Sequence, residues 1–460
     1  MTSRDYRAES FWMETVPGEL SPRPPLEGDE QVDVAIVGAG FTGLWTAYYL
    51  KALQPDLRLA IAEAGIAGSG ASGRNGGWCL GATTGVEAYL SDPEHRQTGL
   101  ALQRALFDTV DEIGRVCVRE NIDCHFAKGG SYQIATAAPH RAALRSQLTA
   151  LRELGFAEQD YRWLEPEECR ARVRTGRNLG GLYTPHCAAL HPARLVRGLA
   201  DAAERRGVRI YEESPATAIE RGAVRTPRGR LSADLVVLAT EAYTRTIPGR
   251  ERNLLPLHSM MIATEPLSEE TWKEIGLERR ETFGDGRRMV TYGQRTADGR
   301  IAFGARGMYY FGSGIRNRFA PDHRAFRRVR EILTFLLPAL SGARITHGWG
   351  GPLGIPRDWR VSVGVDRDQG LAWGGGYVGE GVAPSNLVGR TLADLILERD
   401  TETARLPWVR PFFSDWEPEP LRWLAFRGTR LVGDWLDRAE LRSGSSSRIA
   451  RTVFRSLVRR

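Results

Sequence analysis

The sequence is poor in lysine, in paired cysteines and in long apolar runs, and each shortage excludes a class of protein. Three lysines, against 60 arginines, leave few amines for acid–base catalysis or for Schiff-base formation with a substrate. The five cysteines form no C-x-x-C pair and no cysteine–histidine ligand spacing, so we expect free thiols, no disulfide framework and no metal site. No run approaches 18 apolar residues, which argues against a membrane-spanning helix.

The composition is that of a globular protein with a large core. Of 460 residues, 42% are hydrophobic and 26% are charged, and the length favours two or three domains. Glycine is abundant, at 51 residues, which indicates many tight turns and places where the backbone lies close to a ligand. The net charge is +7, but arginine alternates with acidic residues along most of the chain, so a nucleic-acid partner is not expected.

The N-terminal region has the pattern of an extended arm. Residues 1–31 carry charges and four prolines that prevent a long helix, and Trp12 is expected to pack against the body. The same residues lack the apolar segment of a signal peptide, which predicts a cytoplasmic protein.

Hydrophobic periodicity predicts a βαβ unit at residues 32–62. A strand is expected at 32–37, a helix at 44–53 and a second strand at 57–62, followed by a Gly/Ser/Ala-rich segment, 65–85, without regular structure. Further helices are expected at 97–120, 139–154 and 324–337 and from Pro192 through Ala203, and a strand, glycine turn and helix at 370–398. Strands alternate with a single helix over residues 254–347, which is typical of a mixed sheet.

The segment Val37-Gly-Ala-Gly-Phe-Thr-Gly43 gives the first strand–helix turn a dinucleotide-binding signature. Gly38 permits the tight turn, Gly40 lets the backbone approach a diphosphate, and Gly43 lets helix and strand pack closely. Glu63 follows twenty residues after Gly43. A carboxylate at this position accepts hydrogen bonds from the ribose hydroxyls and repels a 2′-phosphate. The Gly/Ser-rich segment 68–77 is either a surface loop or a binding loop for a cofactor that extends beyond its diphosphate, which favours FAD over NAD.

These residues resemble the D-amino-acid oxidase (DAO) family of FAD-dependent oxidoreductases. The likeness rests on the GAGFTG turn, Glu63, the loop Ala71-Ser-Gly-Arg-Asn-Gly-Gly77, the strand 233–243 and the segment 374–382. The amino-acid sequence of this loop is most similar to that found in the branch of the family that contains gamma-glutamylputrescine oxidoreductase. The resemblance implies dissociable FAD, because the loop has no histidine and no cysteine follows Cys187 as an attachment site.

The resemblance also implies the domain plan and the cofactor residues. The fold class expected is α/β: a discontinuous Rossmann-like FAD-binding domain (32–122, 177–250 and 348–400) with an inserted α+β substrate domain on a mixed or antiparallel sheet (123–176 and 251–347), and a C-terminal extension (401–460). The cofactor residues implied are Gly38, Gly40, Phe41, Thr42, Gly43, Glu63, Ala64, Ser72, Gly73, Arg74, Asn75, Gly76, Gly77, Ala216, Ala239, Thr240, Gly379, Glu380, Gly381 and Val382.

Two departures from the family pattern bear on the substrate and the electron acceptor. Many amino-acid oxidising members hold the substrate carboxylate with an arginine where this chain has Gly351, although Arg306 on a neighbouring strand is a possible substitute. Oxygen-reactive relatives often place a lysine over the flavin, and the matching position here is Ala302. We therefore expect oxidation of a C–N bond in an amine without an adjacent carboxylate. The electron acceptor, oxygen or another carrier, stays open.

The catalytic candidates come from the inserted sheet: His258, Arg306, Tyr309 and Trp349. An amino-acid or N-methyl-amino-acid dehydrogenase or oxidase is the alternative enzyme; a flavin-bearing protein without turnover is the alternative outside catalysis. The C-terminal residues 448–460 space arginines among Ile449, Val453 and Leu457, a pattern that fits a solvated tail, a subunit contact or, less well, an anionic membrane surface. The oligomeric state is left open.

Overall fold

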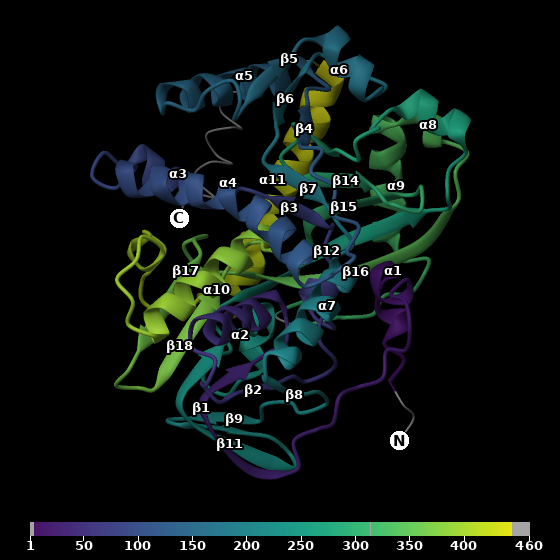
Figure 1. Ribbon diagram of the computed structural model, residues 1–460. Coiled ribbons are helices and arrows are strands. Elements are labelled where there is room, and N and C mark those ends of the chain that lie inside the picture. Colours follow the sequence, from purple (N-terminus) through teal and green to yellow (C-terminus); the bar gives the residue numbers. More distant parts are fainter. Residues whose placement is uncertain (1–3, 313, 444–460) are drawn as a thin grey trace.

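The computed structural model describes residues 4–312 and 314–443, and two eight-stranded sheets form its framework (Figure 1). The strands of the first sheet are β1 (Gly28–Val37), β2 (Leu59–Ala62), β8 (Arg209–Tyr211), β9 (Ala218–Glu220), β10 (Ala223–Arg225), β11 (Gly229–Leu238), β17 (Ser362–Asp366) and β18 (Leu371–Gly375). The order is β17-β18-β11-β1-β2-β8, with β10 pairing β11 and β9 beyond it. β1 runs parallel to both β2 and β11, as a nucleotide-binding sheet requires.

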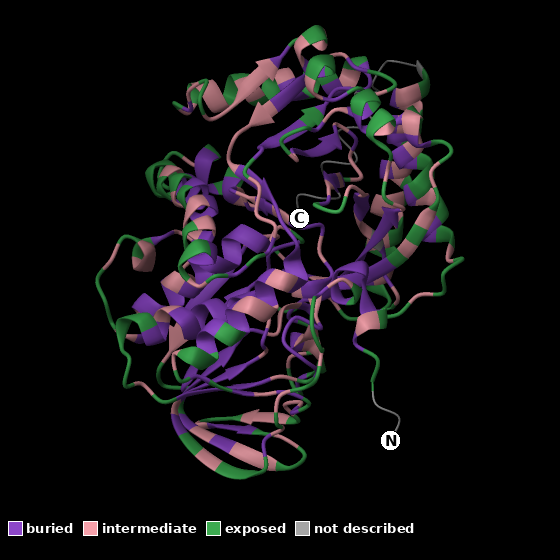
Figure 2. Cartoon of the chain, turned by 45° about the vertical axis from the view of Figure 1, so that its right-hand side comes forward, coloured by how far each residue is buried: buried purple, intermediate pink, exposed green. Residues whose placement is uncertain are grey.

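Four helices cover one face of this sheet: α2 (Phe41–Leu53), α4 (Arg96–Arg119), α7 (Pro192–Arg205) and α10 (Val382–Ile396). Their apolar sides join Ile36, Ile61 and Val237 of the strands in the largest hydrophobic core. The last four residues of β1 and of β11 and all of β2 are buried, which is where these strands approach the helices (Figure 2). The predicted βαβ unit is therefore present, with α2 beginning three residues earlier than its apolar pattern indicated.

The second sheet is mixed, as predicted. Its strands are β4 (Ser131–Ile134), β5 (Arg162–Leu164), β6 (Gly181–Thr184), β12 (Leu255–Thr264), β13 (Thr282–Asp285), β14 (Thr291–Arg295), β15 (Ile301–Tyr309) and β16 (Ile345–Ile355). The order is β16-β12-β15-β14-β13-β4-β6-β5, and β13 runs parallel to β4. Helix α9 (Arg324–Leu336) packs on one face, where Ile262, Phe303 and Val329 share a core. The opposite face carries Ser259, Tyr292 and Arg306.

The sheets assign two strands differently from the expected domain segments. β6 lies within the expected FAD-domain segment 177–250 but pairs with β4 and β5 in the second sheet. Most of β16 lies in the expected segment 348–400 but pairs with β12 over its whole length. β4 and β12, the partners of β6 and β16, are distant from them in sequence, so local patterns gave no sign of these pairings.

The remaining elements include several that periodicity missed. Helix α5 (Ala138–Glu153) agrees with the helix predicted at 139–154. The elements that were missed are α1 (Phe11–Glu14), α3 (Val86–Ser91), α6 (Pro166–Arg172), α8 (Glu269–Ile275), α11 (Leu421–Ser443), short 3-10 turns, and the small sheet of β3 (Trp78–Leu80) with β7 (Cys187–Ala189). Residues 65–85, expected without regular structure, contain β3 and a 3-10 turn at Ala71–Gly73. Residues 254–347 hold a second helix, α8, capped by the Ser268 hydroxyl, which accepts from Thr271 N.

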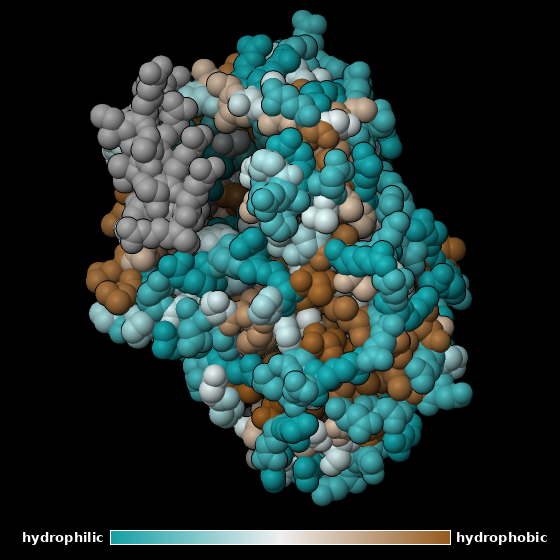
Figure 3. All heavy atoms as spheres, turned by 90° about the vertical axis from the view of Figure 1, so that its left-hand side faces the viewer, coloured by the Kyte–Doolittle hydropathy of each residue, from teal (hydrophilic) through white to brown (hydrophobic). Residues whose placement is uncertain are grey.

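The N-terminal arm packs on the body, and Trp12 is 1% exposed. All five cysteines are free and buried. No helix among residues 4–312 and 314–443 is long and apolar enough to cross a membrane, and the face shown in Figure 3 is mainly hydrophilic with small apolar patches. The predicted basic tail, 448–460, lies outside the described residues.

Candidate functional site

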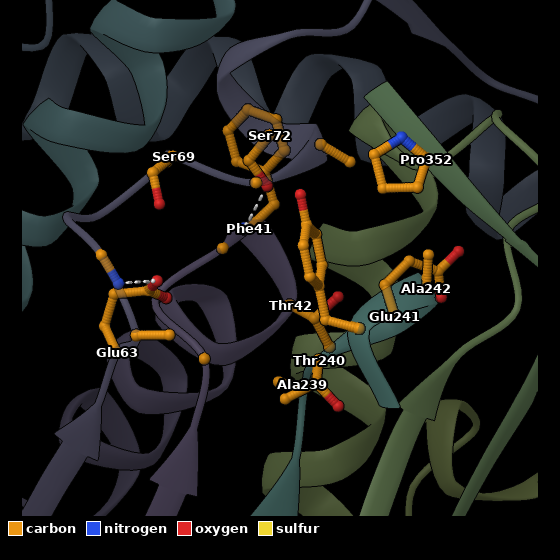
Figure 4. A pocket seen from close by; sticks show the side chains of 18 of the residues that line it. Phe41, Thr42, Glu63, Ser69, Ser72, Ala239, Thr240, Glu241, Ala242 and Pro352 are labelled. Atoms are coloured by element: carbon orange, nitrogen blue, oxygen red, sulfur yellow. Dashed lines mark hydrogen bonds between the residues drawn. The ribbon is translucent and has the colours of Figure 1, made fainter. Parts of the chain in front are cut away.

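A cavity of about 390 Å³ opens where β1, β2 and β11 end (Figure 4). Glu63 and Ser69 lie on one side of the cavity, and Glu241, Ala242 and Pro352 lie on the other. The site is at the carboxyl ends of parallel strands, where α/β sheets bind their ligands. Its two sides come from the first sheet and from β16 of the second sheet, so a ligand in it reaches from one sheet to the other.

The glycine turn has no room for side chains. Gly38 has a φ of +105°, and a Cβ there would lie 2.7 Å from the Ala239 carbonyl oxygen. A Cβ on Gly43 would lie 2.0 Å from the Gly38 oxygen, and one on Gly40 would lie 3.0 Å from the Ser72 hydroxyl. The turn therefore brings the amino end of α2 to the wall of the cavity, where free N–H groups favour a phosphate.

Glu63 ends β2 with its carboxylate at the cavity wall. Its Oε2 accepts from Ala39 N at 2.7 Å and its Oε1 from Gly65 N at 2.9 Å. Burial raises the pKa of Glu63 despite these two backbone hydrogen bonds. The remaining lone pairs are available to ribose hydroxyls, the function that the sequence predicted for this residue.

The loop after Glu63 is fixed by its own polar groups. The Ser72 hydroxyl accepts from Phe41 N at 2.9 Å, which ties the loop to the start of α2. Asn75 donates to the Ser72 carbonyl at 2.8 Å and accepts from Gly77 N at 2.8 Å. A Cβ on Gly76 would lie 2.6 Å from the Tyr292 ring, so the loop packs directly on the second sheet.

Arg74, predicted to bind the cofactor, lines the second cavity but uses its side-chain donors within the protein. Its guanidinium donates to the backbone oxygens of Ser69 and Asn317 and to the Glu9 carboxylate, so its donors bind protein groups. Gly43, Gly73 and Gly77, also predicted to bind the cofactor, do not line the cavity. A Cβ at any of them would lie within 2.4 Å of a backbone carbonyl oxygen, so these glycines allow close packing.

Most of the other predicted cofactor residues do line this cavity: Gly38, Gly40, Phe41, Thr42, Glu63, Ala64, Ser72, Asn75, Ala216, Ala239, Thr240, Gly379, Gly381 and Val382. Gly76 and Glu380 line the adjoining cavity described below. Sequence reasoning missed Arg4, Glu241, Tyr243 and Tyr377, which also line the first cavity.

Glu241 is the most unusual of the missed residues. It has a φ of +46°, and its buried carboxylate accepts from Gly376 N at 2.8 Å and from Tyr377 N at 3.3 Å. Burial raises its pKa from 4.5 to about 7. The side chain thereby joins the end of β11 to the loop that leads into α10, and both segments line the cavity.

A second cavity, of about 310 Å³, adjoins the first and shares Pro352, Leu353, Gly379 and Val382 with it. Arg306, Glu380, Ser259 and Tyr292 line its wall, together with Gly351. Burial raises the pKa of Tyr292 to about 12, so its phenol stays protonated at neutral pH. Ser259 and Tyr292 were not predicted; they occupy the face of the strands opposite to α9, which periodicity alone did not identify.

Of the four catalytic candidates, only Arg306 lines this second cavity. His258 lies on the α9 side of β12, where its Nε2 accepts from Arg316 N at 3.0 Å; its neighbour Ser259 faces the cavity because side chains alternate along a strand. Tyr309 packs in the α9 core, and Trp349 donates from Nε1 to the Arg74 carbonyl at 2.9 Å. These three residues line neither cavity, which corrects their predicted placement.

Arg306 and Glu380 form an ion pair in the second cavity, beside the Gly379 turn that lines both cavities. The Arg306 Nη1 lies 2.7 Å from Glu380 Oε1, and the Thr84 hydroxyl donates to Glu380 Oε2 at 3.0 Å. A Cβ on Gly379 would lie 2.8 Å from Arg306 Cδ, so the arginine lies over this glycine turn. The pair is partly exposed, at 19% and 26% of the two side chains.

A dinucleotide cavity joined to a second cavity across two sheets defines a flavoprotein oxidoreductase. The family model DAO, described as FAD dependent oxidoreductase, matches residues 33–395, and the chain belongs to that family. FAD is therefore its cofactor, and the glycine turn and Glu63 at the cavity wall fit this group.

Relatives of known name match over most of the chain. Gamma-glutamylputrescine oxidoreductase of Escherichia coli is 29% identical over 397 residues, covering 85% of this chain and 90% of the relative. Probable oxidoreductase OrdL of Haemophilus influenzae is 29% identical over 398 residues, covering 82% and 85%. Among solved structures, glycine oxidase from Geobacillus kaustophilus aligns with a TM-score of 0.67 at 23% identity, covering 82% of this chain and 98% of that one, which confirms the fold.

Proposed function

We propose that this enzyme oxidises the C–N bond of an amine that has no carboxylate beside the reacting carbon. One observation carries the proposal: each of the three arginines that line the second cavity already has a carboxylate of the chain as its partner. The pairs are Arg74 with Glu9, Arg287 with Asp285, and Arg306 with Glu380. A substrate carboxylate therefore meets no guanidinium without an acidic partner. At the position where many amino-acid oxidising members of the family have a carboxylate-binding arginine, β16 has Gly351.

Bound FAD supplies the hydride acceptor for such a reaction. The cavity between Tyr292 and the Gly379 turn holds the carbon that loses hydride, and Ser259 and Tyr292 present hydroxyls to the substrate. The amine reacts as its neutral form: the nitrogen lone pair forms the C=N bond as hydride leaves the carbon, and the resulting iminium gives a proton to water. Water then hydrolyses the imine to a carbonyl compound and an amine or ammonia. The chain contributes mainly position, because a correctly held amine needs little further activation.

The shape of the second cavity favours an elongated amine. It is lined from β16, β12, β15, β14, β13 and β4, by Gly351, Ser259, Arg306, Tyr292, Gly284 and Gln133 among others. Neighbouring strands lie about 4.8 Å apart, so a cavity across six of them extends for roughly 24 Å. The Escherichia coli relative is named for gamma-glutamylputrescine, and this name agrees with a long amine.

The test is anaerobic reduction of the flavin, followed by stopped flow, with amines paired with their α-carboxylated counterparts, for example putrescine with ornithine. A charge-assisted hydrogen bond that the carboxylate cannot make is worth about 1.5–3 kcal/mol, so we expect the amines to react roughly ten- to 150-fold faster. Faster reduction by the amino acids would contradict the proposal. The same panel in air, with peroxide measured, distinguishes an oxidase from a dehydrogenase.

The second candidate is an amino-acid or N-methyl-amino-acid oxidoreductase. It is favoured by the partial exposure of Arg306 and Glu380, because a substrate carboxylate that displaced Glu380 would gain the guanidinium. In that case Arg306→Ala should remove any preference for acids in the same panel.

A further inference from the structure

The charges that line the first cavity are unusual for a site that binds a diphosphate. Among the residues that the structure describes, its lining contains two carboxylates, Glu63 and Glu241, and one cationic side chain, Arg4. The diphosphate of FAD is a dianion, and the amino end of α2 supplies only a partial positive charge. A full positive charge beside this cavity therefore has a specific electrostatic use.

Arg4 forms an ion pair with Glu9, which also forms an ion pair with Arg74. The Arg4 guanidinium lies 2.6 Å from Glu9 Oε1 through Nη2, and the other carboxylate oxygen of Glu9 lies 2.7 Å from Arg74 Nη2. The Glu9 side chain is 1% exposed, and its single charge offsets only one of the two guanidiniums. The group of Arg4, Glu9 and Arg74 thus carries a net charge of about +1.

Arg4 is the member of this group that can reach the cofactor. The Arg74 donors bind Ser69, Asn317 and Glu9, whereas the Arg4 side chain is 41% exposed and lines the cavity. The Arg4 guanidinium carbon lies 5.0 Å from the centre of the Tyr6 ring, and a Cβ on Gly65 would lie 3.4 Å from that ring. Arg4 is therefore positioned beside the end of β2, where Glu63 is located.

The arm that carries Arg4 is fixed to the flavin loop. The Ser10 hydroxyl donates to the Gly73 carbonyl at 2.7 Å, and Trp12 Nε1 donates to the Asn75 carbonyl at 2.7 Å. These contacts fix the arm before any ligand binds, which lowers the entropy that Arg4 must lose to make a contact. The arm precedes the residues that match the family model, 33–395.

We propose that the N-terminal arm completes the cofactor site, with Arg4 as a binding residue for the diphosphate of FAD. Glu9 positions Arg4, and the net positive charge of the three-residue group offsets the repulsion that the Glu63 carboxylate exerts on the phosphates. Arginine suits this role because its planar donors match phosphate oxygens.

The experiment measures FAD release and nucleotide competition on the full-length holoprotein. Arg4→Gln should raise the dissociation constant of FAD about tenfold at low salt, in the range of one charge-assisted hydrogen bond, and should weaken its salt dependence. Arg4→Lys should recover most of the loss. The matched control is Arg7→Gln, because Arg7 lies on the same arm and donates to the backbone oxygens of Glu14 and Val16 instead.

Competition with ADP and adenosine distinguishes a phosphate contact from a general effect on the arm. The wild-type protein should release half its FAD at a lower concentration of ADP than of adenosine. Arg4→Gln should reduce the ratio of the adenosine concentration to the ADP concentration at half release about tenfold. An unchanged ratio, or an equal loss in Arg7→Gln, would overturn the proposal. Neither measurement uses an amine, so the result does not depend on the substrate proposed above.

Discussion

The Arg74 Nη2 lies 2.7 Å from the Glu9 Oε2, and the two side chains are 2% and 1% exposed. This buried ion pair joins the N-terminal arm to the loop 68–77, which lines both cavities. The desolvated carboxylate also holds Arg4, and the guanidinium also donates to the backbone carbonyl of Asn317, which lines the first cavity. One pair thus connects the arm, the cofactor loop and the second sheet region, so its loss should affect stability and cofactor binding together.

Glu9→Ala should lower the free energy of unfolding by about 3–5 kcal/mol, because it leaves a buried guanidinium without its counter-charge. The measurement is urea unfolding at a fixed concentration of FAD, since bound cofactor itself adds stability. Glu14→Ala is the control on the same arm: Glu14 is 55% exposed and pairs with His347. A comparable loss in both variants would show that the arm as a whole, and not this pair, is responsible.

Gly40→Val should abolish FAD binding. Even a Cβ at this position would lie 3.0 Å from the Ser72 hydroxyl, and the branched side chain would fill the space beside the amino end of α2. The purified variant should show no flavin absorbance, whereas the wild-type protein should be yellow and release FAD on acid precipitation. Gly342→Ala is the control, because a Cβ there meets no atom within 4 Å. A yellow Gly40→Val protein would refute the placement of the diphosphate.

Glu241 should make stability depend on pH near neutrality. Its pKa is raised from 4.5 to about 7, so the folded state favours the protonated carboxyl. The stabilisation is present below about pH 4.5 and falls as pH rises through about 7, by up to about 3 kcal/mol. Unfolding of the wild-type protein and of Glu241→Gln, compared from pH 5 to 8, should show the wild type losing stability relative to the variant. A constant difference would contradict this assignment.

The length of the second cavity predicts a dependence on substrate length. In a series of unbranched amines that differ in chain length, the rate constant of flavin reduction at low substrate concentration should rise with length, by roughly threefold to fourfold per buried methylene. The gain should cease once the chain extends past β4 to solvent. A rate that is independent of length would mean that the outer part of the cavity serves as an entrance only.

The cofactor half of the site could be predicted from sequence because it depends on local chemistry. The glycine turn, Glu63 and the Ser72 loop lie within 45 residues, and each requirement is visible in the residue type. The substrate half could not, because it depends on which face of each strand turns inward. His258 and Ser259 are neighbours on β12, and only the packing of α9 determines that Ser259 faces the cavity. Glu9 and Arg4 were missed for a similar reason: nothing local indicates that Glu9 pairs with both Arg4 and Arg74.

The ion pair of Arg306 with Glu380 allows a direct test of substrate choice. Glu380→Gln removes the carboxylate that neutralises Arg306 and keeps a side chain of similar size at the same turn. The guanidinium then becomes available to a substrate carboxylate, so reduction of the flavin by ornithine should accelerate relative to putrescine by about ten- to 150-fold.

Arg306→Gln is the matched variant, since it removes the guanidinium and leaves Glu380 free. The ratio of the two rates should then move in the opposite direction, because the cationic amine gains an unpaired carboxylate near its binding site. Thr84→Val controls for disturbance of the turn: it removes only the hydroxyl that donates to Glu380. If both charge variants slowed the two substrates equally, the pair would shape the cavity without selecting the substrate, and the preference for amines would need another cause.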